Sequence, residues 1–117
     1  GDLVAALEQF REVLQIREKL FGTRLHSVVA DTISNIGLVL QAQGDLDGAG
    51  THFEEALSIE EGLHSEHCHP QVAMMLNNLA LVEQSRGNLD KAVNLFRKAQ
   101  EQYTQAYGTK VHPDVLT

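Results

Sequence analysis

The sequence predicts an all-α fold, a solenoid of antiparallel helix pairs stacked side by side, on three observations. The tripeptides at 1–3, 44–46 and 87–89 read Gly-Asp-Leu, Gly-Asp-Leu and Gly-Asn-Leu, and the sequence around them recurs at a constant offset of 43 residues. A constant period of about 20–50 residues is typical of stacked repeat arrays. Apolar residues follow three- and four-residue steps, the spacing of one helix face. The short corners between helices favour antiparallel pairs.

The first two helices have recognisable ends. The first is expected over 2–20, where Asp2 can serve as N-cap and Gly22 can end the helix in a left-handed conformation. The second is expected over 26–43, with Ser27 as its N-cap. Both carry apolar residues on one face, which would pack against the neighbouring helix.

The third helix, expected over 45–62 and capped by Asp45, has the weakest start. Gly48 and Gly50 lie in its first two turns, and glycine in a helix costs about 1 kcal/mol relative to alanine. Two explanations remain open. Either the helix start frays, or a neighbouring helix approaches it closely.

The fourth helix is expected over 69–86, with Pro70 in its first turn, where the missing N–H group costs nothing. The fifth is expected over 88–107 and would end at Gly108. The segment 112–115 repeats the opening of the fourth helix. The prediction is therefore five helices and the start of a sixth.

Composition narrows the range of functions. The net charge is −7 and no cluster of Lys and Arg stands out, which argues against nucleic acid and anionic membrane surfaces as partners. The single Cys68 cannot form an internal disulfide, and no segment is apolar enough to span a membrane. We therefore expect a cytoplasmic location and no cofactor.

One motif carries a family resemblance. It reads L-x-x-L-A-x-x-x-x-x-x-G-[DN]-L-x-x-A-x-x-x-F-x-x-A, and its best copy comprises Leu76, Leu79, Ala80, Gly87, Asn88, Leu89, Ala92, Phe96 and Ala99. With this motif the chain resembles a tetratricopeptide repeat array. It is similar to the long-repeat type of kinesin light chains and nephrocystin-3, because the period is long, His-Pro-x-Val occurs at 69–72 and 112–115, and Leu-Asn-Asn-Leu-Ala occurs at 76–80.

The resemblance implies one array over 1–117. Its expected parts are the second helix of a truncated repeat, two full repeats and the start of another, at 1–25, 26–68, 69–111 and 112–117. Some residues depart from the family pattern. Glu83 stands where the preceding copy has the apolar Leu40, and Ser27 replaces the proline of the later joints. We expect such changes to loosen the last unit without altering the fold.

The resemblance also implies a peptide-binding groove, lined by the first helix of each unit. The implied lining residues are Asp31, Ser34, Asn35, Leu38, Gln41 and Ala42 from one unit, and Met74, Asn77, Asn78, Leu81, Gln84 and Ser85 from the next. Asparagines at this place hold bound peptide in kinesin light chains, which favours Asn35 and Asn78. An amide both donates and accepts, so it can hold a peptide backbone. Alternatively, these side chains are solvated or bond a neighbouring turn.

The nature of the expected ligand follows from the groove residues. None of them is basic, which argues against capture of a terminal carboxylate by charge-assisted bonds. Leu38, Leu81 and Met74 indicate apolar anchors on the ligand.

A histidine-rich segment offers a weak candidate metal site. His64, His67, Cys68 and His69 carry ligand types suited to zinc, copper or nickel. His69 also belongs to the His-Pro joint, however, and that joint recurs at His112 without such neighbours. No metal is therefore expected.

No catalytic set is apparent. A run of acidic residues is expected to form a solvated helix face: Glu54, Glu55, Glu60 and Glu61. The favoured function is a non-enzymatic scaffold that binds a protein or peptide segment in the groove. The alternative is an assembly segment that self-associates through apolar end helices, since arrays without polar caps expose such faces.

Overall fold

The computed structural model describes residues 2–22, 26–64 and 69–107. These residues form five α-helices and no strand: α1 (Asp2–Phe21), α2 (Ser27–Ala42), α3 (Leu46–Leu63), α4 (Pro70–Ser85) and α5 (Leu89–Tyr107). The all-α prediction is confirmed, and each helix end lies within one residue of its expected place. Gly108 and the sixth helix expected at 112–117 lie outside the described residues.

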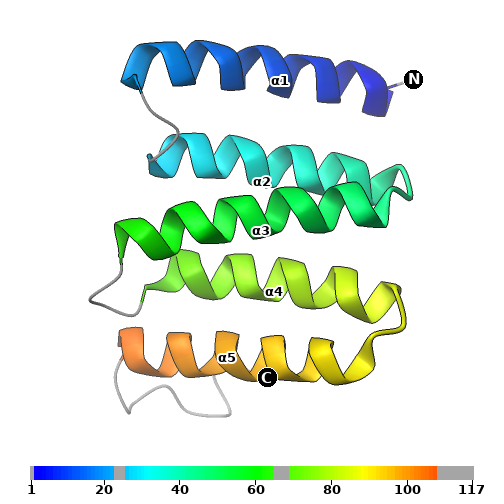
Figure 1. Cartoon of the computed structure of the whole chain (residues 1–117), viewed down its shortest axis with the longest axis vertical. Coiled ribbons are helices and arrows are strands. Elements are labelled where there is room, and N and C mark those ends of the chain that lie inside the picture. The colour runs from blue at the N-terminus through cyan, green and yellow to red at the C-terminus, as the bar shows by residue number, and fades with distance from the viewer. Residues whose placement is uncertain (1, 23–25, 65–68, 108–117) are drawn as a thin grey trace.

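The helices lie side by side in chain order and run in alternating directions (Figure 1). Within the repeats, α2 packs on α3 and α4 packs on α5. Between the repeats, α1 packs on α2 and α3 packs on α4. Each helix is thus supported by its neighbours in sequence, which is the arrangement expected of a solenoid.

Two corners with the same geometry close the helix pairs. Gly44 has a φ of +86° and Gly87 a φ of +85°, in the left-handed region that residues with a Cβ atom rarely adopt. At both corners the residue after the glycine donates its N–H to the carbonyl five residues earlier, at 2.9 Å. These bonds satisfy carbonyls at the end of α2 and α4, so each helix stops and the chain turns back.

Histidines cap the two helices that follow the joints. His26 precedes α2 and His69 precedes α4, and the Nδ1 atom of each accepts a hydrogen bond of 3.1 Å from the backbone N–H two residues later. The prediction of Ser27 as the N-cap was wrong, because Ser27 is the first residue of α2. Pro70 holds the equivalent first position in α4. Asp2 likewise lies inside the first turn of α1 rather than before it.

The start of α3 explains one of its two glycines. Asp45 is the N-cap, and its Oδ1 atom accepts a hydrogen bond of 2.9 Å from the N–H of Gly48. A Cβ atom at Gly48 would collide with this carboxylate. At Gly50 a Cβ atom would meet its nearest neighbour, Val82 Cγ1, at an ordinary 3.6 Å. A close helix approach therefore does not account for either glycine.

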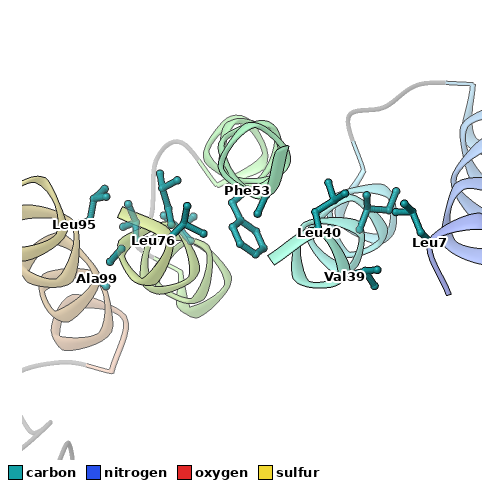
Figure 2. Packing of buried hydrophobic residues seen from close by; sticks show 13 residues of the cluster. Leu7, Val39, Leu40, Phe53, Leu76, Leu95 and Ala99 are labelled. Carbon is teal, nitrogen blue, oxygen red and sulfur yellow. The ribbon is translucent and has the colours of Figure 1, made fainter. Parts of the chain in front are cut away.

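A close approach occurs instead at Gly37 of α2. Phe53 of α3 is fully buried, and a Cβ atom at Gly37 would lie 2.8 Å from its ring atom Cε1. In Figure 2 the ring points from α3 into the space between α2 and α4, with Leu40 on one side and Leu76 on the other. Phe53 thus joins two consecutive repeats.

The core consists of two clusters of buried apolar residues. The larger one extends from Leu7 in α1 to Ala99 in α5 (Figure 2). The second joins α2, α3 and α4: Val29, Ala30, Ile33, Ala56, Ile59 and Met75.

The prediction of a solvated acidic face on α3 was wrong for Glu60, which is completely buried. Its Oε1 atom accepts a 2.7 Å hydrogen bond from Ser27 Oγ, and His64 Nε2 lies 3.2 Å from its Oε2 atom. The cause is the place of Glu60 in the repeat, which is that of Arg17 and Tyr103, side chains that are half-buried. Glu55 is half-buried too, whereas Glu54 and Glu61 are exposed.

Glu83, at the repeat position of Leu40, is also buried, with 1% exposure. Asn88 Nδ2 donates to its Oε2 atom at 2.7 Å. Arg86 Nη1 and Lys91 Nζ lie 3.5 and 3.7 Å from its Oε1 atom. The Glu83 carboxylate is therefore paired although the equivalent position holds an apolar residue, and its bonds connect the end of α4 to the start of α5.

No described residue covers one side of α1. Ile16 is 63% exposed, whereas Ile59, at the same position of the next repeat, is 5% exposed because α2 covers α3. Several large apolar side chains of α1 are exposed in this way or at its edges: Leu3, Val4, Ile16, Leu20 and Phe21.

Candidate functional site

A hollow of about 430 Å³ lies between α2 and α4 and is partly open to solvent. We refer to it as the α2–α4 hollow. Its lining residues are Asp31, Ser34, Asn35 and Leu38 from α2, and Gln71, Met74, Met75 and Asn78 from α4. Six of the predicted groove residues are thus brought together from two consecutive repeats.

Helix periodicity determines which side chains line this hollow. On α2 the lining residues fall at steps of three and four, from Asp31 to Leu38, so they share one stripe. Gly37 and Ile33 lie on another stripe, which packs on α3. Since α3 covers one face of α2, the stripe with Asp31 and Leu38 is free to line the opposite face.

The two asparagines favoured by the sequence differ in their contacts. Asn78 Nδ2 lies 3.5 Å from Ser34 Oγ across the hollow, a distance at the weak limit for a hydrogen bond. Among the described residues, none forms a hydrogen bond with the side chain of Asn35. Both amides therefore retain donor and acceptor capacity.

Apolar side chains stand next to these amides. Leu38 and Met74 line the hollow and are 45% and 44% exposed. Met75 also lines it, but it is buried and belongs to the core. The surface thus combines amide groups with accessible apolar area, a combination common in ligand sites.

Six predicted groove residues do not line the hollow: Gln41, Ala42, Asn77, Leu81, Gln84 and Ser85. Asn77 follows a different stripe from Asn78, because one residue turns a helix by about 100°. Leu81 is 45% exposed and lies one turn beyond Asn78. The hollow includes Gln71, which the sequence reasoning missed. Gln71 precedes Asn78 by seven residues, and extending the groove register back by this step would have identified it.

Of the described residues that line the hollow, Asp31 alone is ionisable. Burial raises the pKa of its carboxyl above the ordinary value of 3.8, and the negative charge of Glu60 raises it further. The guanidinium of Arg17 acts in the opposite direction. Arg17, however, donates to the carbonyl oxygen of Val28 at 3.2 Å and to Thr32 Oγ1, so it is held beside α2 rather than in the hollow.

The histidine segment has a structural explanation. The rings of His64 and His69 stack with centroids 3.8 Å apart, and the rings of Phe21 and His26 stack at 4.0 Å at the preceding joint. Phe21 and His64 occupy equivalent repeat positions, so the stack is part of the joint. Within the described part of the chain no group of three or more His, Cys, Asp or Glu could hold a metal. His67 and Cys68 lie outside it.

The described part of the chain has five helices, and each packs on its neighbours in sequence. The same helix pair recurs along the chain, and a hollow lies between successive repeats. These features define a repeat scaffold of the α-solenoid class. One family model of the tetratricopeptide repeat matches residues 28–105 and 71–116, and a second tetratricopeptide repeat model matches residues 1–24. The chain therefore belongs to the tetratricopeptide repeat family. Repeats of this family generally mediate protein–protein interaction through a non-catalytic fold. The comparison with curated proteins found no match.

No helix in the described ranges has the length and apolar character needed to cross a membrane.

Proposed function

We propose that this chain is a scaffold that binds a peptide segment of a partner protein in the α2–α4 hollow. The observation that supports this proposal is that two amide side chains and two apolar side chains from two repeats line one partly open hollow: Asn35, Asn78, Leu38 and Met74. The amides would bond the peptide backbone, and the apolar side chains would receive apolar anchors.

The main test is peptide display against the whole chain and against an Asn35→Ala, Asn78→Ala double variant. We expect a consensus with the natural chain and its loss with the double variant. Asn94→Ala is the matched control, because Asn94 is an exposed asparagine of α5 outside the hollow. Selection of the same peptides by the double variant would contradict the proposal.

A second test uses a peptide of that consensus and the apolar side of the hollow. Leu38→Asp would place a charge where an apolar anchor binds, and the affinity should fall by about tenfold or more. Leu63→Asp is a suitable control, since Leu63 is 42% exposed at the end of α3 and does not line the hollow.

A second candidate function is self-association through the uncovered side of α1. It is favoured by the contrast between Ile16, which is exposed, and Ile59, which α2 buries. A second copy could cover this side in the same way. Sedimentation over a concentration series should then show association, which Ile16→Asp abolishes. A monomer at all concentrations would reject this candidate.

We further propose that the repeats are of the long kinesin light chain and nephrocystin-3 type, on the basis of the 43-residue period and the His-Pro joint. We also propose a cytoplasmic location, which the single Cys68 supports. Localisation of the tagged full-length protein in cells would test the second point.

A further inference from the structure

The charge of the residues that line the hollow determines whether it favours cationic, neutral or anionic peptides. The described residues that line it include one carboxylate, that of Asp31, and no Lys or Arg. Among the described residues, no ion pair includes Asp31, and Arg17 is engaged with Val28 and Thr32. The charged groups that act on Asp31 are Glu60 and Arg17, of opposite sign. A bound ligand would therefore meet a net negative site.

The distance between Asp31 and Leu38 along α2 determines how far apart a cationic and an apolar side chain of a bound peptide would lie. Asp31 and Leu38 lie seven residues apart on α2, which is about 10 Å along a helix. An extended peptide covers about 10 Å in three residues, at about 3.3 Å each. A cationic side chain opposite Asp31 and an apolar side chain opposite Leu38 would thus be about three positions apart.

The equivalent position in the next repeat has no charge. Met74 of α4 corresponds to Asp31 of α2, and both line the hollow. The same hollow therefore offers a cation at Asp31 an apolar thioether as well, and a thioether can pack along the aliphatic stem of a Lys or Arg side chain. The net charge of −7 for the whole chain also favours the approach of cationic segments.

We propose that the α2–α4 hollow selects an extended, basic peptide segment in which a Lys or Arg opposite Asp31 stands about three residues from an apolar residue opposite Leu38. This inference rests on the proposed function and specifies its ligand. Neutral, purely apolar or acidic peptides would be the competing occupants.

The experiment begins with a library of random linear peptides displayed against the full chain at low salt. We expect enrichment of Lys or Arg about three positions from Leu, Ile, Met or Phe. A synthetic peptide of the enriched sequence and its variant with Ala in place of the basic residue are then titrated by fluorescence anisotropy. The basic peptide should bind about fivefold more tightly, the upper range for a partly exposed ion pair.

Asp31→Asn is the decisive variant. It should lower the affinity for the basic peptide by about fivefold and leave that for the Ala peptide unchanged. The same preference should fade in about 0.5 M salt, because salt screens exposed charges. Asp90→Asn is the matched control, since it removes an exposed carboxylate of α5 outside the hollow, and it should leave the preference intact.

The outcomes distinguish the two levels of the proposal. Enriched peptides that depend on Asn78 but carry no basic residue would overturn the basic selection alone, as would an equal effect of Asp31→Asn on both peptides. If no peptide is enriched, or if Asn78→Ala selects the same peptides as the natural chain, both the groove function and its basic selection are rejected.

Discussion

Gly37 of α2 lies against the ring of Phe53 of α3, so closely that a Cβ atom at Gly37 would come within 2.8 Å of Cε1. The ring is completely buried and cannot withdraw without disturbing the core. We expect Gly37→Ala to lower the free energy of unfolding by about 1–2 kcal/mol, because overpacking outweighs the better helix propensity of alanine. Urea-induced unfolding followed by circular dichroism measures this change.

Gly50→Ala is the control for the substitution itself. It also lies within a helix and is buried, but its nearest heavy atom would be at 3.6 Å. This variant should raise the free energy of unfolding by about 0.5–1 kcal/mol through helix propensity. An equal rise in the free energy of unfolding for Gly37→Ala would contradict the prediction, because it would show that the Phe53 ring can shift without an energetic penalty.

Ser27 at the start of α2 gives the buried Glu60 of α3 its hydrogen bond within one repeat. We expect Ser27→Ala to lower the free energy of unfolding by about 1–3 kcal/mol, since it removes a hydrogen bond from a buried carboxylate. In a Glu60→Met background the same substitution should cost little, because no carboxylate remains to be satisfied. Thermal unfolding of the two single variants and the double variant measures the coupling. Ser58→Ala, at an exposed serine of α3, should be neutral.

Asn88 should stabilise the last helix pair through Glu83 rather than by capping α5. Removal of its 2.7 Å bond in Asn88→Ala should cost about 1–3 kcal/mol of unfolding free energy. Glu83→Leu restores the residue type of Leu40, and in that background the effect of Asn88→Ala should largely disappear. Chemical denaturation tests both statements. A full effect of Asn88→Ala in the Glu83→Leu background would place its role elsewhere.

Asp31 predicts a pH dependence of stability. Burial and Glu60 raise the pKa of this carboxyl above 3.8 in the folded chain, so the folded state binds its proton more tightly than the unfolded state. The stability that this group contributes is present below pH 3.8 and is lost as the pH rises through the folded pKa. Asp31→Asn should therefore stabilise the chain slightly at neutral pH, and the effect stays small because solvent screens this exposed carboxylate.

Denaturation of both chains at neutral and acidic pH measures this difference. It should shrink as the pH falls through the raised pKa. A variant that is less stable than the natural chain at neutral pH would contradict the expected sign.

The sequence predicted the elements of this fold because the repeat and the helix period are local properties. The corners at Gly44 and Gly87 and the cap at Asp45 need only the chain around them. The six lining residues from Asp31 to Asn78 were implied by the resemblance to tetratricopeptide repeats, which assigns the groove to the first helix of each unit. Whether they bind a peptide stays a prediction.

The errors arose where two helices meet. Glu60 has the charge of a surface residue, but its position on α3 faces the start of α2, where Ser27 donates a hydrogen bond to its carboxylate. The alignment of Glu60 with Tyr103 was a signal for this position. Gly37 appeared as one residue of an apolar face, and only the packing of Phe53 requires the absence of its side chain. Such contacts depend on the distance between helices, which a single sequence does not give.

The packing of each helix on its neighbours in sequence has mechanical and kinetic consequences. Most native contacts form between segments close in the chain, so loop closure costs little entropy and folding should be fast. Tension between the two ends would load the helix interfaces in series. We expect the chain to lengthen stepwise under force, as one helix interface separates after another, instead of unfolding in a single event.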